Sequence, residues 1–146
     1  PIDFSHWLMI FGVLLLIPQI GNFPKSRWNY IGSPTLILGI GLIIGMCVLD
    51  FVFWSLKESE LKREVSEHLI NTPEIWTPFM SVSGNIFMIG LLTSSFNYFK
   101  KSKLGVLLIF LGTLTVYLPL GGWDNIPGYL LITVGFYINF INSRKS

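Results

Sequence analysis

The chain has 146 residues, of which 51% are hydrophobic and 12% charged, and its formal net charge is +2. Soluble domains carry about 25% charged residues because their surface must be hydrated, so this composition excludes an ordinary soluble globule. The small net charge gives no basis for nucleic-acid binding. A single cysteine, Cys47, excludes an intrachain disulfide and a thiolate metal cluster.

Apolar runs separated by polar segments predict the secondary structure. About 20 apolar residues cross the hydrocarbon core as a helix, and lipid offers no hydrogen-bond partner to an unpaired backbone. We therefore expect an all-α integral membrane protein, a single membrane domain over residues 1–146 with a five-transmembrane-helix bundle. Because residue 1 is Pro1, we expect that an initiator or short leader was removed, and we interpret the first run as a span rather than a signal peptide. The predicted spans are 4–20, 34–54, 76–99, 104–120 and 127–141.

The polar segment between the second and third runs predicts an amphipathic helix over residues 55–70. Ser55 and Glu58 have the spacing of a capping box. Four apolar residues fall on one face, so we expect the helix to lie on the outer membrane surface or to cap the bundle. A solvated connector and a lid over an outward-opening site are the two functional alternatives. The apolar face consists of Leu56, Leu61, Val65 and Leu69.

The distribution of charge predicts sidedness. With the N-terminus outside, the outer loops receive every acidic residue and only Lys57, Lys62 and Arg63. The inner loops receive all the other basic residues and no acid, as expected from the excess of Lys and Arg in cytoplasmic loops. We therefore predict a plasma (inner) membrane protein with its C-terminus in the cytoplasm. The inner basic residues are Lys25, Arg27, Lys100, Lys101, Lys103, Arg144 and Lys145.

Asp50 is the acid most deeply placed in an apolar run. A carboxylate in hydrocarbon is costly and usually faces a bundle interior or a water path. Ser81, Ser83 and Asn85 make the third run polar and are its candidate partners. Together these residues are candidates for a ligand or ion site. The alternatives are that Asp50 reaches the headgroups or bonds a hydroxyl, and that Asn85 only joins two helices.

Two further sets of residues have recognisable spacing. Asp3 with His6, and Glu64 with His68, have spacings at which two helical side chains can share a metal ion. Both pairs belong to the outer side, and the alternative is that these histidines bind nothing. Gly41 and Gly45 form a small-xxx-small motif, which favours close helix packing within the chain or against another copy.

These features do not identify an activity. The common hydrolase and redox signatures are missing from the sequence, and no cofactor is indicated. The leading hypothesis is a non-enzymatic protein, either a small subunit of a membrane complex or a binder of an apolar, lipid-like ligand. The alternatives are a small-solute or ion transporter using Asp50 and the polar third run, and a membrane enzyme with an outward-facing metal site. The expected partners are the lipid bilayer and other membrane subunits or a second copy.

Overall fold

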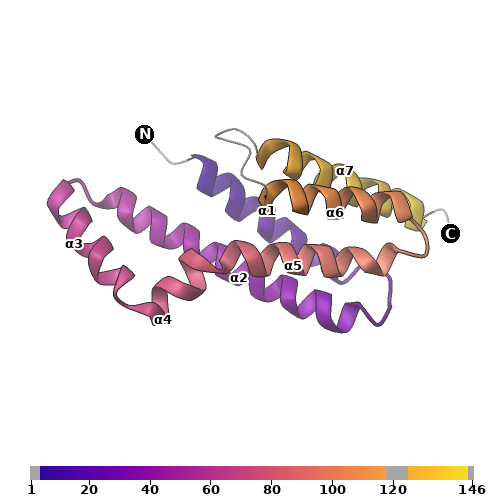
Figure 1. Ribbon diagram of the computed structural model, residues 1–146, viewed down its shortest axis with the longest axis horizontal. Coiled ribbons are helices and arrows are strands. Elements are labelled where there is room, and N and C mark those ends of the chain that lie inside the picture. Colours follow the sequence, from indigo (N-terminus) through magenta and orange to yellow (C-terminus); the bar gives the residue numbers. More distant parts are fainter. Residues whose placement is uncertain (1–3, 118–124, 145–146) are drawn as a thin grey trace.

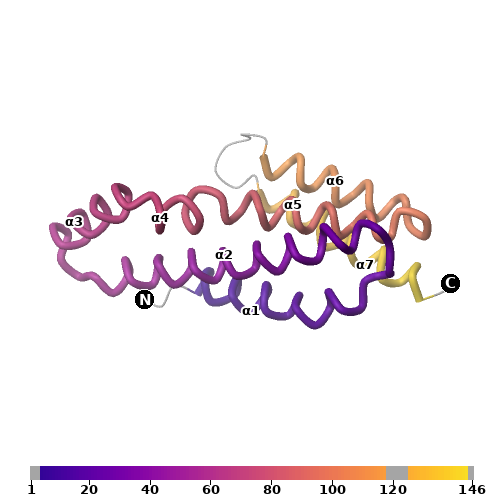
Figure 2. The backbone as a smooth tube through the Cα atoms, turned by 90° about the horizontal axis from the view of Figure 1, so that it is seen from below, coloured from indigo at the N-terminus to yellow at the C-terminus, as the bar shows by residue number. Residues whose placement is uncertain are grey.

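The computed structural model describes residues 4–117 and 125–144, and this part of the chain is helical without strands (Figure 1). The predicted all-α class is confirmed. The helices are arranged as an elongated bundle (Figure 2). In chain order they are α1 (Phe4–Ile20), α2 (Asn29–Ser55), α3 (Ser59–Ile70), α4 (Pro73–Trp76), η1 (Thr77–Ser81), α5 (Ser83–Ser95), η2 (Phe96–Tyr98), α6 (Lys103–Tyr117) and α7 (Asn125–Arg144).

Four of the five predicted runs form single helices. α1 has the predicted bounds, whereas α2 begins at Asn29 and places Pro34 inside the helix rather than at its start. Pro34 lies in the second turn of α2, so the helix lacks the one backbone hydrogen bond that this residue's amide would otherwise donate to the carbonyl of Tyr30. α7 likewise extends beyond the predicted run at both ends. The predicted end of the fourth run, residues 118–120, lies outside the described residues.

The third predicted run is not one straight helix. α4 and η1 are bent by 45° relative to α5 and η2. Pro78 lies within η1, a π-helical turn in which the amide of Val82 donates to the carbonyl of Thr77. Because proline cannot donate a backbone hydrogen bond, it weakens the helical ladder at this point.

Close packing joins the helices in two pairs, α2 with α5 and α6 with α7. Glycines make this possible on both sides of each contact. A Cβ added to Gly39 would lie 2.5 Å from the Cα of Phe87, and one on Gly90 would lie 2.6 Å from the Cα of Leu36. α1 packs mainly on α2, less extensively than either pair packs internally.

The two glycines of the small-xxx-small motif lie in different surroundings. A Cβ added to Gly41 would meet nothing within 4 Å, so Gly41 makes no close approach within this chain. Gly45 faces the ring of Phe79. Gly39, in place of Gly41, lies at the close crossing of α2 and α5.

The amphipathic segment begins later than predicted. Ser55 is the last residue of α2 and its hydroxyl donates to the carbonyl of Val52, so it does not cap the next helix. α3 starts at Ser59, with Glu58 at its N-cap position and no capping side chain. None of its residues is buried, and Leu61 is 42% exposed. The apolar face is therefore only partly covered by the described bundle, since Leu56, Val65 and Leu69 are half-buried.

Within residues 4–117 and 125–144, two helices, α2 and α7, are long and apolar enough to cross a membrane, or three if the bent segment from α4 to η2 counts as one span. Large apolar side chains cover much of the surface between the ends of the bundle; Phe4, Leu15, Ile37, Leu130 and Tyr137 are all more than half exposed. Apolar patches of this size are rare on soluble monomers. The described part of the bundle thus has the surface of a membrane-associated protein.

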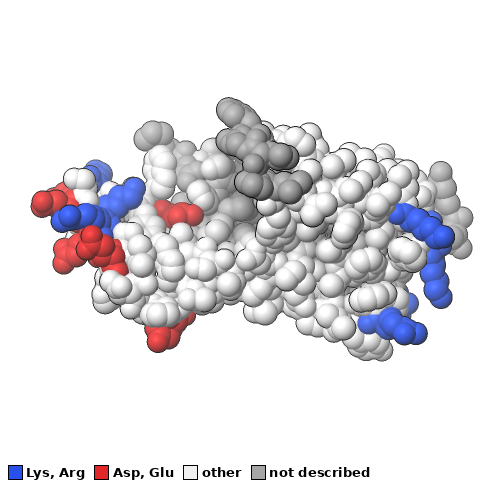
Figure 3. All heavy atoms as spheres, viewed as in Figure 1, with Lys and Arg blue, Asp and Glu red and all other residues white. Residues whose placement is uncertain are grey.

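Charged side chains gather at the two opposite ends of the bundle (Figure 3). We call the end with the α1–α2 and η2–α6 connections and the last turn of α7 the basic end. Its charged residues are Lys25, Arg27, Lys100, Lys101, Lys103 and Arg144, with no acid among the described residues. We call the end that carries α3 the acidic end. Every described acid lies toward it, on α2, α3, α4 or the connection before α3.

Candidate functional site

A hydrogen-bonded histidine–aspartate pair joins α1 to α2 near the acidic end. The Nε2 of His6 lies 2.9 Å from Oδ2 of Asp50, and both side chains are 25% exposed. Nε2–H can donate this hydrogen bond in the neutral or the protonated ring. The adjacent rings of Trp7 and Phe51 pack at 5.1 Å, and His6 meets Phe51 edge-on. These contacts fasten α1 to α2 at this end.

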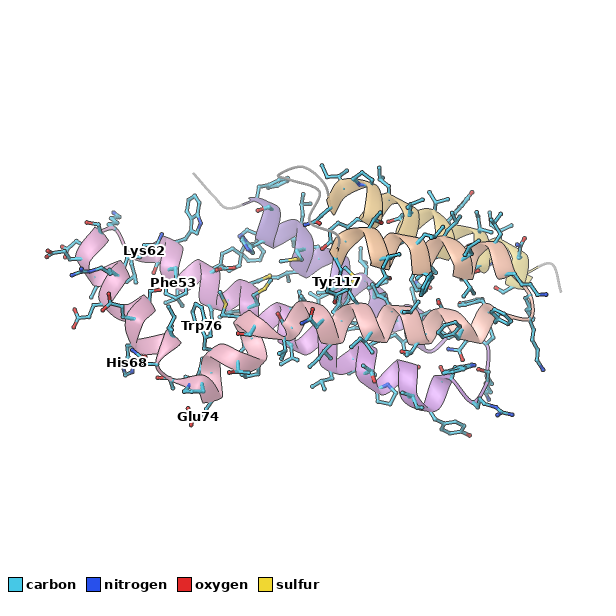
Figure 4. All side chains as sticks on the ribbon, in the orientation of Figure 1. Phe53, Lys62, His68, Glu74, Trp76 and Tyr117 are labelled. Atoms are coloured by element: carbon cyan, nitrogen blue, oxygen red, sulfur yellow. The ribbon has the colours of Figure 1, made fainter. Side chains whose placement is uncertain are left out.

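A cleft of about 500 Å³ opens beside this pair, between α1, α2 and α3. Phe53 of α2 and Lys62 of α3 lie near each other at this end (Figure 4). The cleft carries both signs of charge, and Arg63 lies 4.0 Å from Glu67. The lining residues are His6, Asp50, Phe53, Trp54, Ser59, Lys62, Arg63, Ser66 and Glu67.

The candidate metal ligands are not gathered at this cleft. Neither Glu64 nor His68 lines it, and His68 is exposed on α3 (Figure 4). Within residues 4–117 and 125–144, no three His, Cys, Asp or Glu side chains lie close enough together to hold a metal ion. Asp3 lies outside the described residues. His6 is brought to Asp50 instead, a pairing that the spacing within either helix did not indicate.

Ser83 and Asn85, two polar residues of the third run, bond to groups other than His6 and Asp50. The buried Ser83 hydroxyl donates to the sulfur of Met46, at 3.6 Å. The hydroxyl of Tyr117 donates to Oδ1 of Asn85, at 2.9 Å, and joins α6 to α5. Ser81 is exposed at the end of η1. Asn85 thus makes an interhelical hydrogen bond, one of the two roles considered for it.

A long apolar groove lies on another face, between α1, α5 and α7. Two adjoining hollows of about 380 and 580 Å³ share Leu16, Leu91 and Phe136, so they form one continuous groove. Gly12 lies in its wall, and a Cβ added there would meet nothing within 4 Å. α1 packs mainly against α2, and the α6–α7 pair packs against the other helices mainly through α5. The groove is the space that this packing leaves between α1 and α7.

The two ends of the groove differ in polarity. Toward the acidic end its walls are almost entirely apolar, with Met9 and Tyr129 on opposite sides. Toward the basic end it is lined by Gln19, Asn22 and Arg144. An elongated apolar groove with polar groups at one end fits an amphiphilic molecule, whose chain and head have different surroundings.

Arg144 is held at the polar end of the groove by an aromatic ring. Its Cζ lies 4.3 Å from the ring centroid of Phe140, which also lines the groove. A guanidinium stacked on an aromatic face keeps the N–H groups at its edge available for hydrogen bonds. Phe23, which is buried, stacks on Phe136 and meets Tyr98 edge-on, so the wall of this end is ordered.

Sequence reasoning missed both the His6–Asp50 pair and the groove. The pair could have been found from the predicted topology, because consecutive antiparallel spans bring their outer ends together. The groove had no comparable signal, since its walls are ordinary apolar residues, and Arg144 was considered only for its contribution to sidedness.

Comparisons of the chain with protein-family models, with curated proteins and with solved structures found no match.

Proposed function

We propose that the protein is an integral membrane protein with five crossings, in which the broken α4–η2 segment is one crossing. The separation of charge supports this arrangement, because the basic end carries no acid in the described residues. By the positive-inside rule the basic end faces the cytoplasm. α1 and the described part of α6 are short for a crossing. They fit if flanking aromatic residues reach the interface or the bilayer thins locally.

The length of α2 sets the depth of Asp50 in this arrangement. From Tyr30 to Asp50 the helix rises about 30 Å, which equals the hydrocarbon thickness of a typical bilayer. With Tyr30 at the inner interface, Asp50 lies at the outer interface beside His6. This depth favours a structural ion pair over a mid-membrane ion site and gives the transporter hypothesis less support.

We further propose that the protein binds a lipid-like amphiphile in the α1–α5–α7 groove, with an acyl chain along the apolar walls. The observation that carries this proposal is the continuous groove with its polar groups at one end. Apolar walls gain dispersion contacts with a chain that fits them. A membrane subunit role remains compatible, since a lipid bound there could lie at a contact between subunits.

Gly12→Phe tests the proposal because it fills the groove from a position with open space around the Cβ. The matched control is Gly41→Phe, also at an exposed glycine without neighbours but outside the groove. The phenyl ring would occupy the space in which the acyl chain lies and remove the chain's contacts with the walls, so the variant should bind lipid about tenfold more weakly or worse, which corresponds to about 1.4 kcal/mol. Native mass spectrometry of the purified full chain would measure retained lipid. Equal retention by Gly12→Phe and wild type would contradict the proposal.

A further inference from the structure

We propose that the groove selects a phospholipid with a net-negative headgroup, taken from the leaflet at the basic end, and that Arg144 binds its phosphate. This inference rests on the proposed lipid-binding function and adds the class of lipid, its orientation and the residue that recognises it. The supporting observations are the position of Arg144, the charge of the basic end and the length of the groove.

Arg144 is the charged residue that lines the groove, and it lies at the polar end. Its guanidinium is stacked on Phe140, with Cζ 4.3 Å from the ring centroid. A guanidinium can give two parallel hydrogen bonds to a phosphate, which makes it a better match for this group than for a neutral head. The side-chain amides of Gln19 and Asn22, on the opposite wall, can donate or accept hydrogen bonds to the rest of the headgroup.

The surrounding charge favours an anion at this place. Lys25, Arg27, Lys100, Lys101 and Lys103 lie at the same end as Arg144. In the described part of the chain no carboxylate lies at this end, so an anionic headgroup meets no repulsion and a zwitterionic one finds no carboxylate for its cation. The charges together concentrate anionic lipid near the groove before it binds.

The length of the groove fits one leaflet. From Arg144 to Tyr129, residues at the two ends of the groove on α7, the helix rises about 22 Å. Half of a bilayer, with its headgroup region, is about 20–22 Å thick. A phospholipid whose phosphate lies at Arg144 therefore has its chain ends near Tyr129. The match in length indicates that one lipid fills the groove, and the polar lining with Arg144 orients its head toward the basic end.

The test compares phosphatidylglycerol and phosphatidylcholine with identical acyl chains, titrated into the detergent-purified full chain and followed by native mass spectrometry. We expect wild type to bind phosphatidylglycerol at least about tenfold more tightly. Arg144→Gln should weaken phosphatidylglycerol binding by about tenfold, because it removes one charge-assisted phosphate contact. Phosphatidylcholine carries the same phosphate but also a choline cation that the positive Arg144 repels, so its binding should weaken less and the preference should become smaller. Lys101→Gln removes a charge at the same end but outside the groove, and should keep the preference.

The outcomes separate this inference from the proposed function. Suppose that Gly12→Phe abolishes binding, that wild type binds the two lipids equally, and that Arg144→Gln changes neither affinity. That result would keep the groove as the lipid site and overturn the assignment of the headgroup. Equal loss of preference in Lys101→Gln and Arg144→Gln would assign selection to the general charge of this end and overturn the role of Arg144. A free fatty acid that displaces phosphatidylglycerol at equal concentration would overturn the choice of a phospholipid. Failure of wild type to bind either lipid would overturn the proposed function itself.

Discussion

At the scale of single residues, the His6–Asp50 pair is the contact that most needs measurement. The two side chains are a quarter exposed, so water and salt screen them only in part. Their hydrogen bond joins α1 to α2, beside the ring contacts that Trp7 and His6 make with Phe51. Its contribution decides how firmly one wall of the groove is held.

A double-mutant cycle with His6→Ala, Asp50→Ala and the double variant should give a coupling energy of about 1 kcal/mol, the value expected for a partly exposed charged hydrogen bond. The cycle is needed because His6 makes a further interaction, so its single substitution removes more than this pair. Thermal unfolding in detergent is the measurement. Strict additivity of the two single effects would show that the pair contributes nothing to stability.

At the scale of helices, the closeness of α2 and α5 depends on which glycines lie at the crossing. Gly39 lies against the backbone of Phe87, whereas Gly41, two residues further along the same helix, has open space around it. Backbone atoms cannot move aside as a flexible side chain can, so an added methyl group forces the helices apart. The two glycines therefore provide a matched comparison within one helix.

Gly39→Ala should lower the free energy of unfolding by about 1–3 kcal/mol, as expected for overpacking a tight contact. Gly41→Ala should be neutral or slightly stabilising, because alanine favours a helix more than glycine does. Both can be followed by thermal unfolding in the same detergent. A larger loss from Gly41→Ala would indicate that Gly41, as the motif also allowed, packs against another copy.

At the scale of the whole molecule, the charge separation predicts which end can be reached from outside the cell. Single cysteines at Glu60 and Lys101 lie at the acidic and basic ends, and both positions are exposed. The natural Cys47 is completely buried, so it should not react and need not be removed. In intact cells a membrane-impermeant maleimide should label Glu60→Cys but not Lys101→Cys. Labelling of Lys101→Cys alone would reverse the proposed orientation.

The sequence by itself determined the all-helical class, the positions of most helices and the charge pattern of their ends. The length of each apolar run and the charges beside it can be read directly from the sequence. A backbone in apolar surroundings must also satisfy its own hydrogen bonds, which makes each run a helix. The break near Pro78 and the later start of α3 at Ser59 were not predicted. Both depend on which local backbone hydrogen bonds form, and the composition of a segment does not specify these.

Only the tertiary structure decided which helix faces meet. The candidate spanning helices are apolar on most sides, so their sequences do not record how each is rotated about its axis. For that reason Gly41 could not be distinguished from Gly39, and His6 was paired with Asp3 on its own helix rather than with Asp50 on the next. The groove depends on the same information, because it is the space left where α1 packs on α2 and not on α7.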